Sequence, residues 1–137
     1  MPNIDVTYIP CDDFTRQELT KEITQAVVDA LPCPATDVHI RFHDVPPTHY
    51  AYAGYLDTDG DTALFQMNVA WFAGKNPEMA KALAATLTEK ITGILGIEAE
   101  KVEIGTDELH RKNYYIGGKP VDRDLPVEAR SPLDFVR

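Results

Sequence analysis

The chain has 137 residues, enough for one compact domain, and its 44% apolar and 26% charged content is typical of a globular protein. Its 22 acidic and 13 basic side chains give a formal charge of −9, which argues against nucleic acid as a partner. No segment approaches the roughly 20 apolar residues that span a bilayer, and acidic residues interrupt the N-terminus too early for a signal peptide. Two cysteines make a poor disulfide framework, so we expect free thiols and a cytoplasmic protein.

The first half of the chain predicts a strand, a helix and a second strand. Apolar and polar residues alternate over positions 4–8, which is typical of a half-buried strand. Thr15 and Glu18 have the spacing of a capping box, and an apolar stripe at helical spacing follows them until two prolines end the helix. The second strand covers residues 38–42 and leads into a loop at 49–54.

The second half repeats this order. Residues 65–71 alternate as a strand does, Pro77 stands at a good first helical position, a further strand begins at Val102, and a matching loop covers 113–118. Adding 64 to a residue number maps Leu19, Ile23, Val27 and Leu31 of the first helix onto Leu83, Leu87, Ile91 and Leu95 of the second. We therefore predict one domain over residues 1–137, built from repeats at about 2–56 and 63–120, with a tail at 121–137.

Each repeat is a β-α-β unit, which closes with a right-handed crossover. Two such units side by side predict an α+β fold, in which one four-stranded sheet carries both helices on one face. The helices would cover Ile40 and Phe42, whereas His39, Arg41 and His43 would point to the other face. Because a sheet with one bare face buries little surface, we expect that face to pack against copies of the same chain.

Three features together resemble the tautomerase superfamily: the Met1-Pro2 start, the duplicated β-α-β unit and a Tyr-x-x-x-Gly loop after the second strand of each unit. The loop is similar to that of 4-oxalocrotonate tautomerase. The fused length is similar to that of malonate semialdehyde decarboxylase, cis-3-chloroacrylic acid dehalogenase and macrophage migration inhibitory factor. The resemblance covers about residues 2–120 and implies a homotrimer without a cofactor or a metal.

The resemblance also implies three catalytic residues. Pro2 matches the catalytic proline, which acts as a general base or acid through its free amine after Met1 is removed. His39 falls where 4-oxalocrotonate tautomerase has an arginine on its second strand, and Asp37 falls where the decarboxylase has an acidic residue. Each has an alternative interpretation, because His39 is also suited to an oligomer interface and Asp37 to capping a turn.

Four further residues are implied as substrate-binding groups. Lys75 stands where the family has a carboxylate-binding arginine before a helix, and Arg41 shares a strand face with His39. Tyr50 and Tyr114 match the aromatic residue of the loop. Lys75 is also typical of a solvated loop, Arg41 of a subunit ion pair, and the tyrosines of a core or an interface.

The chemistry follows from the secondary amine. Burial in an apolar pocket and nearby cations both favour its neutral form, which can accept a proton. We therefore predict a cofactor-independent tautomerase or isomerase of a small 2-oxo acid or related carbonyl compound. The alternatives are decarboxylation or hydration of a three-carbon acid, or a non-enzymatic binding homologue in which Met1 is retained and the Pro2 nitrogen is an amide.

Overall fold

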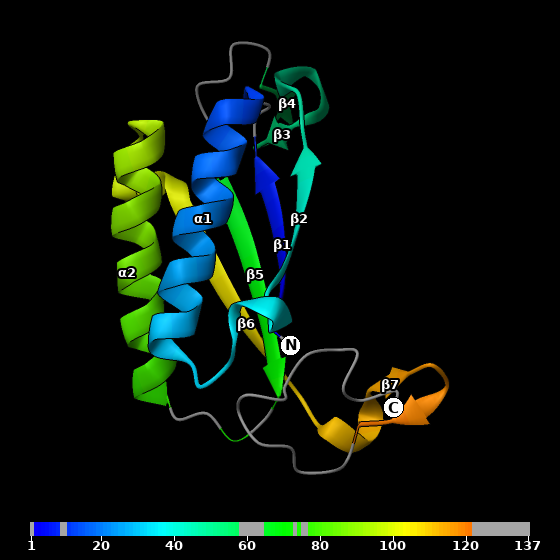
Figure 1. Cartoon of the computed structure of the whole chain (residues 1–137). Coiled ribbons are helices and arrows are strands. Elements are labelled where there is room, and N and C mark those ends of the chain that lie inside the picture. Colours follow the sequence, from blue (N-terminus) through cyan, green and yellow to red (C-terminus); the bar gives the residue numbers. More distant parts are fainter. Residues whose placement is uncertain (1, 9–10, 58–64, 73, 75–76, 122–137) are drawn as a thin grey trace.

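The computed structural model describes residues 2–8, 11–57, 65–72, 74 and 77–121 (Figure 1). Its long elements are β1 (Asn3–Tyr8), α1 (Asp13–Ala30), β2 (His39–Asp44), β5 (Phe65–Phe72), α2 (Pro77–Leu95) and β6 (Val102–Leu109). Its short strands are β3 (Ala51–Tyr52), β4 (Tyr55–Leu56), β7 (Tyr115–Ile116) and β8 (Lys119–Pro120). Short 3-10 helices cover Ala35–Asp37, Pro47–His49, Ala99–Lys101 and Arg111–Asn113.

The four long strands form one sheet in the order β2-β1-β5-β6. The outer pairs β1–β2 and β5–β6 are parallel, as β-α-β units require, and the central pair β1–β5 is antiparallel. Both helices cover the same face of the sheet (Figure 1). The predicted α+β fold with two helices on one face of a four-stranded sheet is therefore confirmed.

The helix-facing side of the sheet holds the core. Alternation in β1 and β5 buries every second side chain, and the helices close over them with their apolar stripes. The fully or almost fully buried residues of this cluster are Ile4, Val6, Tyr8, Leu19, Ile23, Ala26, Val27, Leu31, Phe65, Met67, Val69, Trp71, Leu83, Leu87 and Ile91.

Helix α1 begins earlier than the capping-box spacing predicts. Its N-cap is Asp12, whose side-chain carboxylate accepts a hydrogen bond from the backbone N–H of Thr15 at 2.7 Å. An aspartate at this position satisfies one of the unpaired N–H groups of the first turn. Asp12 is therefore the N-cap in place of Thr15, and the helix begins at Asp13.

The bare face of the sheet is polar and internally paired. His39, Arg41 and His43 are exposed there, as predicted from the alternation of their strand. Arg41 and His43 both bond the Asp5 carboxylate. Ladder-like contacts join Gln66 to Glu103 and Asn68 to Asp107. A shallow depression of ≈ 290 Å³ lies over β1, β5 and β6 on this side.

The short elements repeat as the long ones do. The 3-10 helix at Pro47–His49 and the hairpin β3–β4 recur 64 residues later as Arg111–Asn113 and the hairpin β7–β8. Each hairpin is closed by an equivalent backbone bond, from Asp57 N to Tyr50 O at 2.7 Å and from Val121 N to Tyr114 O at 2.9 Å. Val121 is buried, and the rest of the predicted tail, 122–137, lies outside the described residues. Among the described helices, none has the length and apolar character that a membrane span requires.

Candidate active site

Pro2 lies where three strands meet at one end of the sheet. It directly precedes β1, and its carbonyl oxygen accepts a hydrogen bond from the backbone N–H of His39 at 3.2 Å. The antiparallel pairing of Asn3 with Ala70 brings the end of β5 to the same place. Pro2 is buried, so its ring is already shielded from water in a single chain.

The wall next to Pro2 is aromatic. The pairing of Ile4 with Val69 and of Asn3 with Ala70 continues one step further to set Trp71 opposite Pro2 on the helix-facing side. Trp71 is 2% exposed and belongs to the main core cluster. An apolar neighbour of this size excludes water from the proline, as a neutral amine requires.

Asp37 supplies a carboxyl group at the same end. It is the last residue of the 3-10 helix that precedes β2, and it is fully buried (0% exposed). The next residue but one, His39, begins β2 and is hydrogen-bonded to Pro2 through its backbone. The chain therefore brings the three predicted catalytic residues, Pro2, Asp37 and His39, to one end of the sheet, with the His39 side chain on the bare face.

Tyr114 reaches this end from the second unit. Its hydroxyl group accepts a hydrogen bond from the side-chain amide of Asn3 at 3.1 Å. Its ring packs edge-on against Phe72, with the ring centres 5.6 Å apart. Tyr114 thus lies beside the strand that Pro2 begins, consistent with its predicted position in the site.

Arg111 is a cation at this end that sequence reasoning missed. Its guanidinium group lies 5.1 Å from the ring centre of Phe72, in a cation–π contact. No motif marks it, since the equivalent residue of the first unit is Pro47. The 3-10 helix that follows β6 brings Arg111 close to Phe72. The only sequence signal for this region is the 64-residue repeat, which places Arg111 in the loop before Tyr114.

Arg41 lies one step along β2 on the bare face. Its Nε and a terminal nitrogen donate to the two Asp5 oxygens at 3.0 and 3.3 Å. The hydrogen bond to Asp5 raises the pKa of Arg41, and Tyr114 contributes a smaller electrostatic effect in the same direction. Arg41 therefore has a carboxylate partner already, for which a substrate carboxylate would have to compete.

One other predicted binding residue, Tyr50, is not brought to Pro2 within a single chain. Tyr50 follows the far end of β2, after the 3-10 helix Pro47–His49, and so lies at the opposite end of the sheet within one chain. Lys75 lies outside the described residues, and its role stays a prediction. Within the described part of the chain, no three His, Cys, Asp or Glu residues are arranged to hold a metal ion.

Comparison with known proteins shows which families have a similar sequence and fold. The family model described as tautomerase enzyme matches residues 3–59. A wild-type fused 4-OT called F6, an asymmetric trimer, is 26% identical over 88% of this chain and 96% of its own, with a TM-score of 0.79. Residues 3–59 thus match the tautomerase family, and the chain as a whole has the fold of the fused 4-OT proteins.

More distant structures share the fold of this chain. Pt0534, whose structure was determined after inactivation by 2-oxo-3-pentynoate, is 21% identical over 88% of this chain and 95% of its own, with a TM-score of 0.77. N1, a member of the cis-3-chloroacrylic acid dehalogenase family, is 20% identical over 88% of this chain and 83% of its own, with a TM-score of 0.75. None of the curated proteins matches the chain in sequence.

The two ends of the sheet have diverged. Asn3 pairs with His39 and Gln66 with Glu103, so Phe65 occupies in the second unit the position of Pro2 in the first. Phe65 is inside the chain and offers no amine. The far end of the sheet therefore lacks the proline, although the fold there is equivalent.

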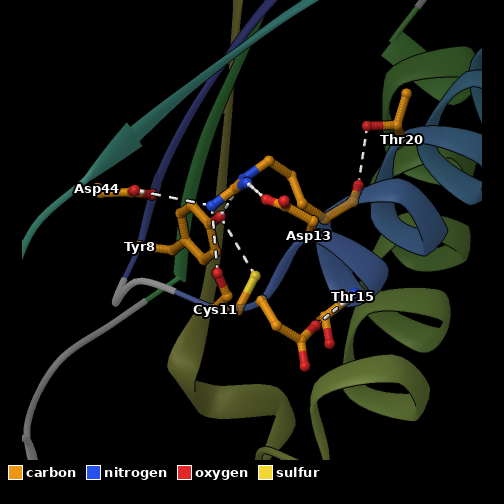
Figure 2. Close-up of polar contacts among 8 residues, drawn as sticks. Tyr8, Cys11, Asp13, Thr15, Thr20 and Asp44 are labelled. Atoms are coloured by element: carbon orange, nitrogen blue, oxygen red, sulfur yellow. Dashed lines mark hydrogen bonds and ion pairs between the residues drawn. The ribbon is translucent and has the colours of Figure 1, made fainter.

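The far end carries a polar cluster instead. Tyr8 is 3% exposed, and its hydroxyl group accepts hydrogen bonds from Arg16 Nε at 3.1 Å and Cys11 Sγ at 3.3 Å (Figure 2). Burial, with a further contribution from the Cys11 hydrogen bond, raises the pKa of Tyr8 to about 12. Arg16 also bonds Asp13 and the backbone oxygen of Cys11, so this cluster ties the start of α1 to β1.

Proposed function

We propose that the chain is a cofactor-independent enzyme that tautomerises a small 2-oxo acid with the Pro2 amine, after removal of Met1. The observation that carries the proposal is a buried Pro2 at the start of β1, with Trp71 across from it and Arg111 at the same end. The match of residues 3–59 to the tautomerase family model and the likeness to the F6 fused 4-OT support this class of activity. The inactivation of Pt0534 by a 2-oxo acid supports the substrate class.

The proposed reaction moves one proton and needs no oxidant. The neutral Pro2 nitrogen takes the proton from the 2-hydroxyl group of an enol, and the oxygen electrons form the C2 carbonyl. The C2–C3 electron pair then takes the proton back from the Pro2 ammonium at C3, which restores the neutral amine. Arg111 would hold the carboxylate and stabilise charge on the enolate oxygen.

Asp37 supports a second reaction at the same site. A buried carboxyl group at the same end of the sheet as Pro2 is suited to activating water or orienting a substrate carboxylate, as decarboxylation or hydration of a three-carbon acid requires. Assaying both phenylenolpyruvate and 3-oxopropanoate with the Asp37→Asn variant separates the two. We expect the variant to retain tautomerisation and to lose decarboxylation.

We also propose that the active protein is a homotrimer. The bare polar face of the sheet and the exposed aromatic residues of the β3–β4 hairpin, Tyr52 and Tyr55, are surfaces that a neighbouring copy would cover. The F6 protein is a trimer, which supports this assembly. In a trimer, Tyr50 of a neighbouring subunit would be free to reach the Pro2 end. Sedimentation equilibrium tests this, and a monomer at micromolar concentration would contradict it.

The decisive experiment changes the amine and leaves the side chains alone. A chain extended by one residue before Met1 keeps Met1, so its Pro2 nitrogen is an amide without basicity. Intact mass establishes which form is present. We expect processed protein to turn over phenylenolpyruvate and 2-hydroxymuconate, and the extended protein and Pro2→Ala to lose at least about a hundredfold in kcat/KM. Full activity of the extended chain would refute the role of Pro2, and native protein that retains Met1 would favour the non-enzymatic binding homologue.

A further inference from the structure

Trp71 contains a buried hydrogen-bond donor without an acceptor. The residue is 2% exposed, and its indole Nε1 has no hydrogen-bond partner in the described part of the chain. An indole N–H can only donate, so no alternative orientation of the group satisfies it. Unpaired buried donors are rare in folded proteins, and each one calls for an explanation in strain, bound water or function.

The same position in the first unit is satisfied. Tyr8 pairs with Asp44 and Trp71 with Glu108, so the two aromatic residues are equivalent in the repeat. The Tyr8 hydroxyl group receives hydrogen bonds from Arg16 and Cys11 (Figure 2). The fold can therefore supply a partner to this position, and it does so at the end that lacks the proline.

Among the described residues of the second unit, the position equivalent to Arg16 offers Trp71 no partner. Helix α1 begins at Asp13 and α2 at Pro77, so the equivalent of Arg16 on α2 is Ala80. An alanine side chain has no polar atom and cannot contact the indole N–H through a hydrogen bond. The unpaired donor is thus specific to the end of the sheet where Pro2 lies.

The register sets this donor next to the reacting amine. The β1–β5 pairing ends at Asn3 with Ala70, and its register, continued by one residue, sets Trp71 opposite Pro2 on the same face of the sheet. Side chains at such positions have Cβ atoms about 4.5–5.5 Å apart. Removing Met1, which the proposed function requires, also frees space at the Pro2 nitrogen for a ligand.

We propose that Trp71 is a substrate-contacting residue whose indole N–H donates a hydrogen bond to the carbonyl or enolate oxygen of a 2-oxo acid bound at Pro2. This inference rests on the proposed function and deepens it. The bond strengthens as negative charge develops on the oxygen, so it stabilises the enolate more than the bound substrate. Its loss therefore lowers kcat more than it raises KM.

The test replaces the N–H and keeps the ring. Trp71→3-benzothienylalanine, introduced by amber suppression, exchanges the indole N–H for sulfur at nearly the same volume. We expect kcat/KM for phenylenolpyruvate to fall about tenfold, mainly in kcat, with the unfolding midpoint unchanged or raised and the pH profile retained. The matched control is Tyr8→Phe, which removes the equivalent polar group at the far end. It should lower the unfolding midpoint and leave kcat/KM within about twofold.

A second readout does not depend on turnover. Trp71 is the single tryptophan of the chain, so its indole gives one ¹H–¹⁵N cross-peak. We expect that peak to move downfield on saturation with phenylpyruvate in processed protein, and not in the Met1-retaining protein. A stationary peak at saturation, or wild-type kcat/KM in the benzothienyl protein, overturns the role of Trp71. Absent turnover with a moving peak instead refutes the proposed reaction and supports the contact.

Discussion

The hydrogen bonds around Tyr8 should contribute measurably to the free energy of unfolding. Tyr8→Phe removes a buried hydroxyl group that accepts from Arg16 Nε at 3.1 Å and from the Cys11 thiol at 3.3 Å. A hydrogen bond to a charged group contributes about 1.5–3 kcal/mol, and the thiol bond adds little. Arg16 retains its contacts with Asp13 and the Cys11 carbonyl, which limits the loss. We expect the free energy of unfolding to fall by about 2 kcal/mol.

Urea unfolding at pH 7 and one fixed protein concentration measures this change. The control is Tyr52→Phe, because that side chain is 64% exposed and its hydroxyl group is solvated in both states. The control should change stability by less than about 0.5 kcal/mol. If Tyr8→Phe and Tyr52→Phe are equally stable, the cluster does not hold α1 against β1.

The same variant predicts a pH dependence. Burial raises the pKa of Tyr8 to about 12, from about 10 in the unfolded chain, so the folded state favours the neutral phenol. This contribution is fully present below pH 10 and is lost as the pH rises toward 12. Wild-type stability should therefore fall relative to Tyr8→Phe across that interval. A constant difference between pH 9 and pH 12 would contradict the assignment.

Two further predictions concern the sheet and α2. Hydrogen bonds from Arg41 and then His43 lower the pKa of Asp5 below its usual 3.8, so their contribution is present at pH 7 and lost as the pH falls through the folded value. Asp5→Asn should lower stability by about 0.5 kcal/mol at pH 7 and by nothing measurable at pH 2, in parallel urea titrations; an equal loss at both pH values would exclude this pairing. A Cβ at Gly105 would lie 2.8 Å from Asn68 Oδ1, so Gly105→Ala should destabilise by about 1 kcal/mol as Asn68 shifts away from Asp107. Its control is Gly93→Ala, because an added Cβ at this position inside α2 meets no described atom within 4 Å apart from the helix backbone. Thermal unfolding should show that this control is stabilised by about 0.5–1 kcal/mol. The opposite order of the two melting temperatures would refute the steric argument.

Several features of the candidate site followed from sequence and others did not. The resemblance indicated Pro2, Asp37, His39 and Tyr114, and the described chain brings these four to one end of the sheet. Arg111 was missed because no motif marks it, and its cation–π partner Phe72 lies far from it in the sequence. Tyr50 and Tyr114 match the same loop motif, but the motif does not show that the two loops lie at opposite ends of the sheet. The sequence therefore did not reveal that only Tyr114 lies at the Pro2 end of its own chain.

The amino-acid sequence by itself determined the elements and their order, since periodicities of 2 and 3.6 residues and a repeat of 64 are properties of neighbouring residues. The tertiary structure decided what surrounds the proline. Trp71 becomes the neighbour of Pro2 only through the antiparallel register of β1 with β5, which no local pattern encodes. For the same reason, only the packed structure shows that an indole N–H has no partner among the described residues at one end, while a phenol is satisfied at the other.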